Sequence, residues 1–258
     1  MIRQARQGEN ELRIRAAVRA VLSPGVWLVI AVRVFIVVLW SHMIIPASVP
    51  TTSEAGPTSS MALLVTLSLF VYAYLFGGAL RSFVVGDGRV SVLEILKRGK
   101  EVFNQFVWLC IKAVLIVLLT AVFFLSASAT GASGELEVQA RLEEIAPTMN
   151  LIGTIALFIV PFLLVYWLPL VFVTRDFRML STMRAAVVTL WRRLSTSGYL
   201  AFLVLFPVAL FWLVPDNVPL VVVLALGIFG DLMRWTARVY CAQYLVKERG
   251  AIARAASG

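Results

Sequence analysis

Long, nearly unbroken runs of apolar residues alternate along this chain with short segments rich in arginine and lysine. About 20 apolar residues, at about 1.5 Å per residue, cross the roughly 30 Å hydrocarbon core of a bilayer as a helix. A helix is expected in each run because a backbone in lipid must satisfy its own polar groups. Six runs are candidates, the fifth being short: residues 25–45, 61–80, 103–125, 151–173, 199–214 and 218–240.

This pattern predicts an all-α fold, a polytopic membrane helical bundle of about six transmembrane helices with additional cytoplasmic amphipathic helices. It divides the chain into a basic amphipathic N-terminal segment (1–24), a six-span transmembrane domain (25–246) and a C-terminal tail (247–258). The first apolar run is longer than the about 7–15 residues of a signal peptide, so we expect it to be a retained helix. The small residues Gly77 and Gly78 are expected to allow close helix contact.

The composition excludes an ordinary soluble domain. Hydrophobic residues make up 60% of the chain and charged residues 14%, whereas soluble domains have about 45–50% and about 25%. The mean hydropathy is +0.91. The formal net charge of +9 would suggest nucleic acid as the partner of a soluble protein. Here the charges cluster beside the apolar runs, so the expected partners are anionic membrane lipids and not nucleic acid.

The positive charges lie on one side of the predicted bundle. Twenty of the 23 lysines and arginines fall before the first run, between runs two and three, between runs four and five, and around the end of the sixth run. The opposite loops hold only Arg141, while Arg33 and Lys112 lie inside runs. This positive-inside asymmetry predicts a multi-pass membrane protein with both termini in the cytoplasm.

A short amphipathic stretch precedes each run that leaves the cytoplasmic side. Apolar residues repeat at helical spacing before run one and before run five, and more weakly before run three, where Gly99 interrupts the pattern. Basic amphipathic helices of this kind bind anionic lipid or a partner protein; alternatively, they are only the positive loops that insertion requires. The candidate docking residues are Arg13, Arg15, Arg19, Lys97, Arg98, Arg178, Arg184, Arg192 and Arg193.

Two of these cytoplasmic segments carry a resemblance. Residues 86–103 read GDGRVSVLEILKRGKEVF, a turn and an amphipathic stretch that leads into the next run, and residues 173–194 read VTRDFRMLSTMRAAVVTLWRRL. In these segments and in its layout the chain resembles the membrane domain associated with some glycerophosphodiester phosphodiesterases, and related six-span proteins of unassigned function in bacterial inner membranes. The resemblance implies that this chain, too, lies in a bacterial inner membrane. The phosphodiesterase barrel and its catalytic residues are absent from this sequence, so the resemblance implies a fold and not a reaction.

Three ionisable residues inside the runs form a candidate site, because a charge within the membrane is a functional-site hypothesis by default. At a helical rise, Arg33 and Lys112 lie about 12–13 Å from the inner edge, and Asp231 lies about 10 Å from it. We therefore expect an intramembrane polar layer of Arg33, Lys112 and Asp231. The alternative is that both cations extend to the inner headgroups while Asp231 pairs locally with Arg234.

Little in the sequence supports catalysis or cofactor binding. His42 is the sole histidine, and Cys110 and Cys241 lie far apart in apolar runs. No metal site, cofactor, disulfide framework or nucleophile–base pair is therefore expected.

The sequence favours a non-enzymatic membrane scaffold or accessory subunit that engages lipid or a cytoplasmic partner through its basic amphipathic helices. The alternative is a permease-like subunit of a transporter. In that reading, helices at 91–102 and 177–194 dock a separate ATPase and the polar layer lines the path.

Overall fold

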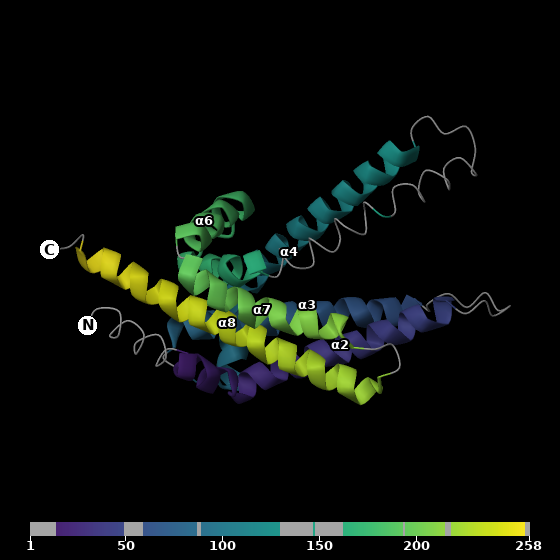
Figure 1. Cartoon of the computed structure of the whole chain (residues 1–258), viewed down its shortest axis with the longest axis horizontal. Helices are drawn as coiled ribbons and strands as arrows, with labels where there is room; N and C mark the ends of the chain where they lie inside the picture. The colour runs from purple at the N-terminus through teal and green to yellow at the C-terminus, as the bar shows by residue number, and fades with distance from the viewer. Residues whose placement is uncertain are drawn as a thin grey trace.

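The computed structural model describes residues 14–48, 59–86, 89–129, 147, 162–192, 194–214 and 218–255. Over these residues the chain is helical and has no strand (Figure 1), which confirms the all-α prediction. Two helices without labels are Ile14–Val21 and Phe162–Thr174. The labelled helices are α2 (Pro24–Ser48), α3 (Ser59–Val85), α4 (Val92–Ala129), α6 (Met179–Arg192), α7 (Leu194–Trp212) and α8 (Leu220–Ala255).

Two of the described helices are long and apolar enough to cross a membrane, Leu63–Val85 in α3 and Val92–Thr120 in α4. The helix Ile14–Val21 and the α2 segment Pro24–Trp40 meet at a bend of 62° and make a third candidate if they form one span. Two further apolar helices are shorter, Phe162–Thr174 and Gly198–Leu210. The described helices are thus those of a membrane protein, while the number of six spans stays a prediction.

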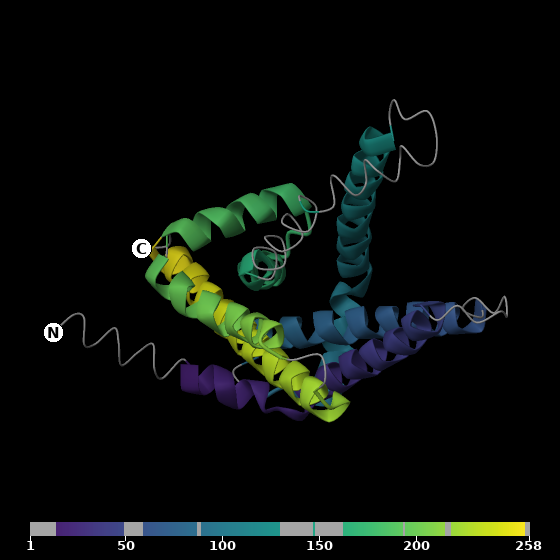
Figure 2. The same ribbon diagram turned by 45° about the vertical axis from the view of Figure 1, so that its right-hand side comes forward.

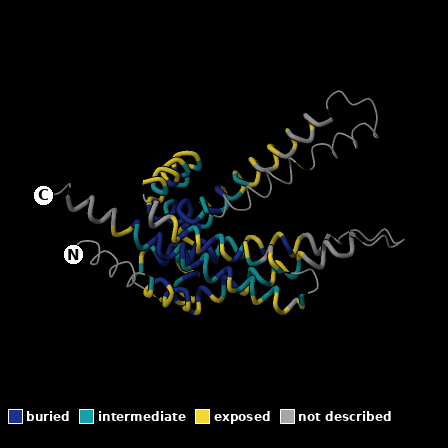
Figure 3. The backbone as a smooth tube through the Cα atoms, viewed as in Figure 1, coloured by how far each residue is buried: buried dark blue, intermediate teal, exposed yellow. Residues whose placement is uncertain are grey.

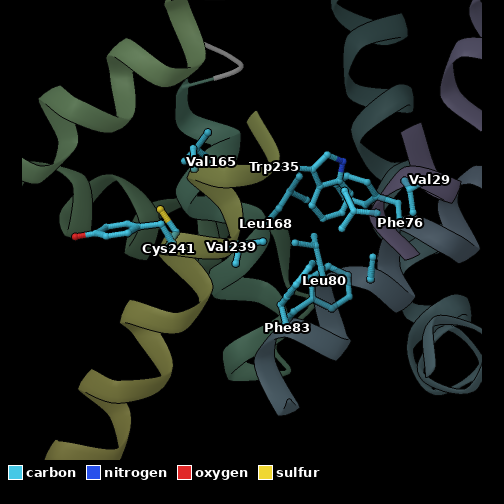
Figure 4. Close-up of a cluster of buried hydrophobic side chains, with 14 of the residues drawn as sticks. Val29, Phe76, Leu80, Phe83, Val165, Leu168, Trp235, Val239 and Cys241 are labelled. Atoms are coloured by element: carbon cyan, nitrogen blue, oxygen red, sulfur yellow. The ribbon is translucent and has the colours of Figure 1, made fainter. Parts of the chain in front are cut away.

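The buried core lies where the helices converge, toward one end of the bundle (Figure 3). It contains the N-terminal parts of α2, α4 and α7, the C-terminal part of α3, the middle of α8 and the helix Phe162–Thr174. At the centre, the Trp235 ring lies 5.1 Å from the Phe76 ring (Figure 4). Away from this core the helices expose large apolar side chains such as Leu63, Phe123 and Val221. Apolar surface of this kind is stable in lipid and unfavourable in water.

α3 and α4 approach each other most closely at two glycines. A Cβ atom on Gly78 would overlap the carbonyl oxygen of Ile95 and lie 3.0 Å from the backbone nitrogen of Gly99. A Cβ atom on Gly99 would in turn lie 3.0 Å from the carbonyl oxygen of Tyr74. The Tyr74 hydroxyl donates a hydrogen bond of 2.5 Å to the Leu96 carbonyl oxygen. Small residues let the two backbones touch, which confirms the expected close contact at Gly78.

Gly99, which interrupts the apolar pattern before run three, lies inside a continuous helix. α4 runs without interruption from Val92 to Ala129, so the predicted surface stretch and the third run form one helix. Glycine costs a helix about 1 kcal/mol relative to alanine, but Gly99 is buried against α3, and the close packing offsets that cost. Beyond the contact α4 diverges from α3 as a separate arm (Figures 1 and 2).

Other helix boundaries have local causes. Pro24 opens α2, a position at which proline removes no hydrogen bond, and the Ser23 carbonyl oxygen accepts hydrogen bonds from the amides of Val26 and Trp27. Arg175 follows Thr174 with a φ of 56°, the left-handed conformation that commonly ends a helix. α8 continues past the predicted domain boundary at 246 to Ala255.

Candidate functional site

Asp231 of α8 is a buried carboxylate that meets two arginines. Its residue is only 5% exposed. Arg33 of α2 forms an ion pair with it, and Arg234, one turn further along α8, has its Nη1 atom 3.8 Å from the Asp231 Oδ1 atom. We call Arg33, Asp231 and Arg234 the α2–α8 charge cluster. The two pairings that the sequence left as alternatives therefore occur together.

The α2–α8 charge cluster lines a cavity of about 190 Å³. The other lining residues are mostly apolar: Val34, Val37, Val223, Leu224 and Gly227. In such surroundings a charge that loses its partner is costly, whereas the pair itself adds little net stability over apolar side chains of the same volume. The ion pair between Arg33 and Asp231 links α2 to α8 at this cavity.

Arg238 lies one more turn along α8 and packs on aromatic rings. Its guanidinium carbon lies 5.1 Å from the Phe76 ring centre and 5.6 Å from the Trp235 ring centre. A cation over an aromatic face is attracted by the negative π surface, by about 2 kcal/mol when desolvated. Asp231, Arg234 and Arg238 therefore lie on successive turns of α8, and the last of them packs in the aromatic core.

The structure does not bring Lys112 to the charge cluster. Lys112 is exposed on α4 and is not among the described residues that line the cavity of this cluster. The described lining of the cavity comes from α2 and α8. Lys112 is therefore not part of the α2–α8 charge cluster, because a count along a run does not predict the face of the helix on which a side chain lies.

The helix Ile14–Val21 presents a mixed basic and apolar face. Ala17, Ala20 and Val21 are buried in the core. The opposite face exposes Arg15, Val18, Arg19 and Leu22, which share it because they are three or four residues apart. Arg13, another candidate docking residue, lies outside the described residues.

The beginning of α4 repeats this arrangement. Leu93, Leu96, Lys97 and Lys100 are exposed and lie at helical spacing on one face. Arg98 differs from the predicted docking role, because its Nη1 atom donates a 2.8 Å hydrogen bond to the Glu101 Oε1 atom. Arg98 also lines a cleft together with Arg81 and Arg175, whereas Lys97 and Lys100 are not among the residues that line it.

α6 shows the basic apolar face most clearly. Its inner side is attached to the helix Phe162–Thr174 by a 2.8 Å hydrogen bond from the Trp167 indole nitrogen to the Thr182 hydroxyl oxygen. On the outer side, Leu180 is 81% exposed and Trp191 is 72% exposed. Arg184 and Arg192 are exposed beside them, and the predicted docking residue Arg193 lies outside the described residues.

Arg178, another candidate docking residue, contacts an acidic side chain two residues before it. Its side chain and its backbone amide bind the Asp176 carboxylate, at 3.1 Å from Nε and 3.0 Å from the amide nitrogen. These hydrogen bonds and the guanidinium charge hold the pKa of Asp176 below its usual range. The carboxylate therefore stays charged near neutral pH and stabilises the turn before α6, while the Arg178 side chain itself is 84% exposed.

Over the described residues, no group of three or more histidine, cysteine or acidic side chains is placed to hold a metal ion. The sequence pattern also missed one cluster, in which Arg81, Arg98 and Arg175 line a common cleft. These arginines lie on different elements and far apart in the chain. No local periodicity predicts that they meet, and only the unusual conformation of Arg175 marks the site once the structure is known.

Comparison of the chain with family models, curated proteins and solved structures finds no match. The resemblance to the membrane domain of glycerophosphodiester phosphodiesterases therefore stays a prediction.

Proposed function

We propose that this chain is a non-enzymatic, six-span protein of the bacterial inner membrane, a scaffold or accessory subunit with both termini in the cytoplasm. Its three basic amphipathic segments, the helix Ile14–Val21, the beginning of α4, and α6, bind the anionic headgroups of the inner leaflet. The observation that carries the proposal is the outer face of α6, where Leu180, Val187 and Trp191 are exposed beside Arg184.

The position of the core supports the proposed threading. The residues that pack together come from the beginning of α2, the end of α3 and the beginning of α4, which is the alternation expected of helices that cross in opposite directions. The same ends adjoin the segments rich in lysine and arginine. Alternate helix ends therefore meet on the side that the positive-inside rule assigns to the cytoplasm.

The energetics favour a membrane surface as the occupant of the α6 face. Each lysine or arginine near an anionic surface contributes about 1 kcal/mol, and apolar side chains beside it insert into the interface. The three segments expose six such cations at described positions: Arg15, Arg19, Lys97, Lys100, Arg184 and Arg192. Their summed attraction, about 6 kcal/mol before screening by salt, suffices to hold these segments at the interface.

Trp191 reports directly on this interface. In nanodiscs that contain the full chain, we expect brominated phosphatidylglycerol to quench the Trp191 emission more than brominated phosphatidylcholine at the same mole fraction. The contribution of Trp191 is obtained by subtracting the emission of the Trp191→Phe variant. Replacing Arg184 and Arg192 with glutamine should lower the preference for phosphatidylglycerol by about a factor of five for each charge.

The matched control keeps the charges, because Arg184→Lys with Arg192→Lys should retain the preference. Equal quenching by the two lipids, or a preference unchanged by the glutamine variant, would contradict the proposed role of α6.

The α2–α8 charge cluster supports a second candidate, the permease-like subunit. A cavity with three charged residues between two helices is a feature that transport paths also have. A transporter of this kind requires a partner that supplies energy. An ATPase that copurifies with the chain, and no longer does so when Leu93 and Lys97 are substituted, would favour the permease-like subunit over the scaffold.

A further inference from the structure

A polar cleft of about 740 Å³ lies between the end of α3, the first turns of α4 and the turn before α6. Its charged lining is formed by Arg81, Arg98, Glu101 and Arg175, with Gln105 and Phe177 beside them. Three guanidinium groups therefore face one carboxylate, a surplus of two positive charges among the described lining residues. We call this site the basic cleft.

Arg81 forms the inner wall of the basic cleft. Its side chain is only 7% exposed, and its Nη1 atom donates a 3.2 Å hydrogen bond to the carbonyl oxygen of Phe172. Its Nε atom lies 3.8 Å from the Glu101 Oε2 atom, too far for a hydrogen bond, and has no hydrogen-bond partner within the described residues. The structure thus holds a buried guanidinium whose donors are only partly used.

Glu101 cannot neutralise the basic cleft alone. Its carboxylate accepts the 2.8 Å hydrogen bond from Arg98 and is also the nearest acid to Arg81. Asp176, which adjoins Arg175 in the chain, is already bound by the side chain and amide of Arg178. The positive surplus therefore remains for an added anion.

Arg175 completes the basic cleft at a conformational cost. It adopts the left-handed conformation, with a φ of 56°, which glycine tolerates and other residues reach only with strain. Backbone strain of this kind occurs preferentially at functional sites. Here it ends the helix Phe162–Thr174 at the residue whose side chain lines the cleft.

We propose that the basic cleft binds a phosphate group. Arginine is suited to phosphate because its planar fork of donors matches two phosphate oxygens at once. Glu101 orients Arg98, Arg81 supplies a buried donor, and Gln105 of α4 also lines the cleft. The volume lies in the range of small-molecule sites, about 300–1,000 Å³, so the cleft takes a phosphate together with part of the group that carries it.

Two sources supply such a phosphate. The cleft lies at the end of the bundle that the basic segments mark, so the headgroup of an anionic phospholipid is one source, and a water-soluble phosphate compound is the other. The inference goes beyond the proposed surface binding, because a soluble phosphate would bind the basic cleft whether or not α6 lies on the membrane.

Two assays on the full chain distinguish the sources. Isothermal titration calorimetry in uncharged detergent measures inorganic phosphate, and native mass spectrometry of chain released from nanodiscs counts retained phosphatidic acid. We expect Arg98→Gln and Arg175→Gly each to weaken the binding of one of these probes by about tenfold or more, because each removes a charge-assisted contact. If the variants bind inorganic phosphate more weakly in the calorimeter, the ligand is a soluble phosphate compound. If they only retain less phosphatidic acid in the mass spectrum, the ligand is a lipid headgroup.

The variants separate binding from folding. Arg175→Gly removes a guanidinium and relieves the strained conformation, so its unfolding temperature should equal or exceed that of the wild type while its phosphate binding falls. Arg89→Gln is the matched control, since Arg89 is exposed and is not among the residues that line the cleft. The proposal is overturned if Arg98→Gln and Arg175→Gly bind both probes as Arg89→Gln does.

Discussion

Replacing Asp231 with alanine is expected to destabilise the folded chain by about 3 kcal/mol. Removal of one partner from a buried ion pair costs about 3–5 kcal/mol, because the remaining charge stays in a poorly solvated place. The lower end of this range applies because the Arg33 side chain is 37% exposed and water offsets part of the loss. Arg234 loses the same carboxylate, so Asp231→Ala leaves two cations facing each other.

The reciprocal substitution should cost less. In Arg33→Leu the Asp231 carboxylate still has Arg234 at 3.8 Å, so we expect a loss of about 1–2 kcal/mol. The double variant Arg33→Leu with Asp231→Leu removes both charges and fills the space with apolar atoms, so it should be more stable than Asp231→Ala alone. Thermal unfolding in detergent ranks the three variants. Equal losses for Asp231→Ala and Arg33→Leu would show that the charge cluster does not depend on its single carboxylate.

The second large loss of stability is expected from a substitution at the contact between α3 and α4. Gly78→Ala places a Cβ atom against the backbone of Ile95 and Gly99, which cannot move as a side chain can. We expect a loss of about 3 kcal/mol, at the upper end of the cost of overpacking, with a lower unfolding temperature and separation of α4 from α3. The basic cleft should weaken as well, because Arg81 and Arg98 lie within one turn of this contact.

Gly77 provides the matched control for this prediction. A Cβ atom on Gly77 would lie 3.3 Å from a Phe106 ring carbon and 3.4 Å from a Val102 methyl carbon, both in side chains that can shift. Alanine also favours a helix over glycine by about 1 kcal/mol, so Gly77→Ala should be close to neutral. Similar unfolding temperatures for Gly77→Ala and Gly78→Ala would contradict the backbone contact.

The hydrophobic pattern predicted the helices well where burial in lipid or in the core determines their course. The runs at 25–45 and 61–80 correspond to α2 and α3, with extensions of a few residues. The pattern is weakest around Gly99, which interrupts the apolar stripe but lies inside α4. A neighbouring helix supplies the packing that keeps it helical, and one-dimensional periodicity does not contain that neighbour.

The candidate sites show the same limit. A count along the helices predicted comparable depths for Arg33 and Asp231, and the structure brings these two residues together. The same count included Lys112, which is exposed on a diverging helix. The basic cleft was not predicted because its arginines come from three elements, and only the three-dimensional contacts bring them to one cavity.

The central claim is that the helix ends with the positive charges all lie on one side of the membrane. Single cysteines test it most directly, in a variant whose Cys110 and Cys241 are replaced by alanine. We expect a membrane-impermeant maleimide to label Ala140→Cys and Asp216→Cys in cells whose inner membrane is intact. Ala5→Cys and Ser257→Cys should react only after that membrane is permeabilised. Labelling of position 140 or 216 under the same conditions as either terminus would contradict the account.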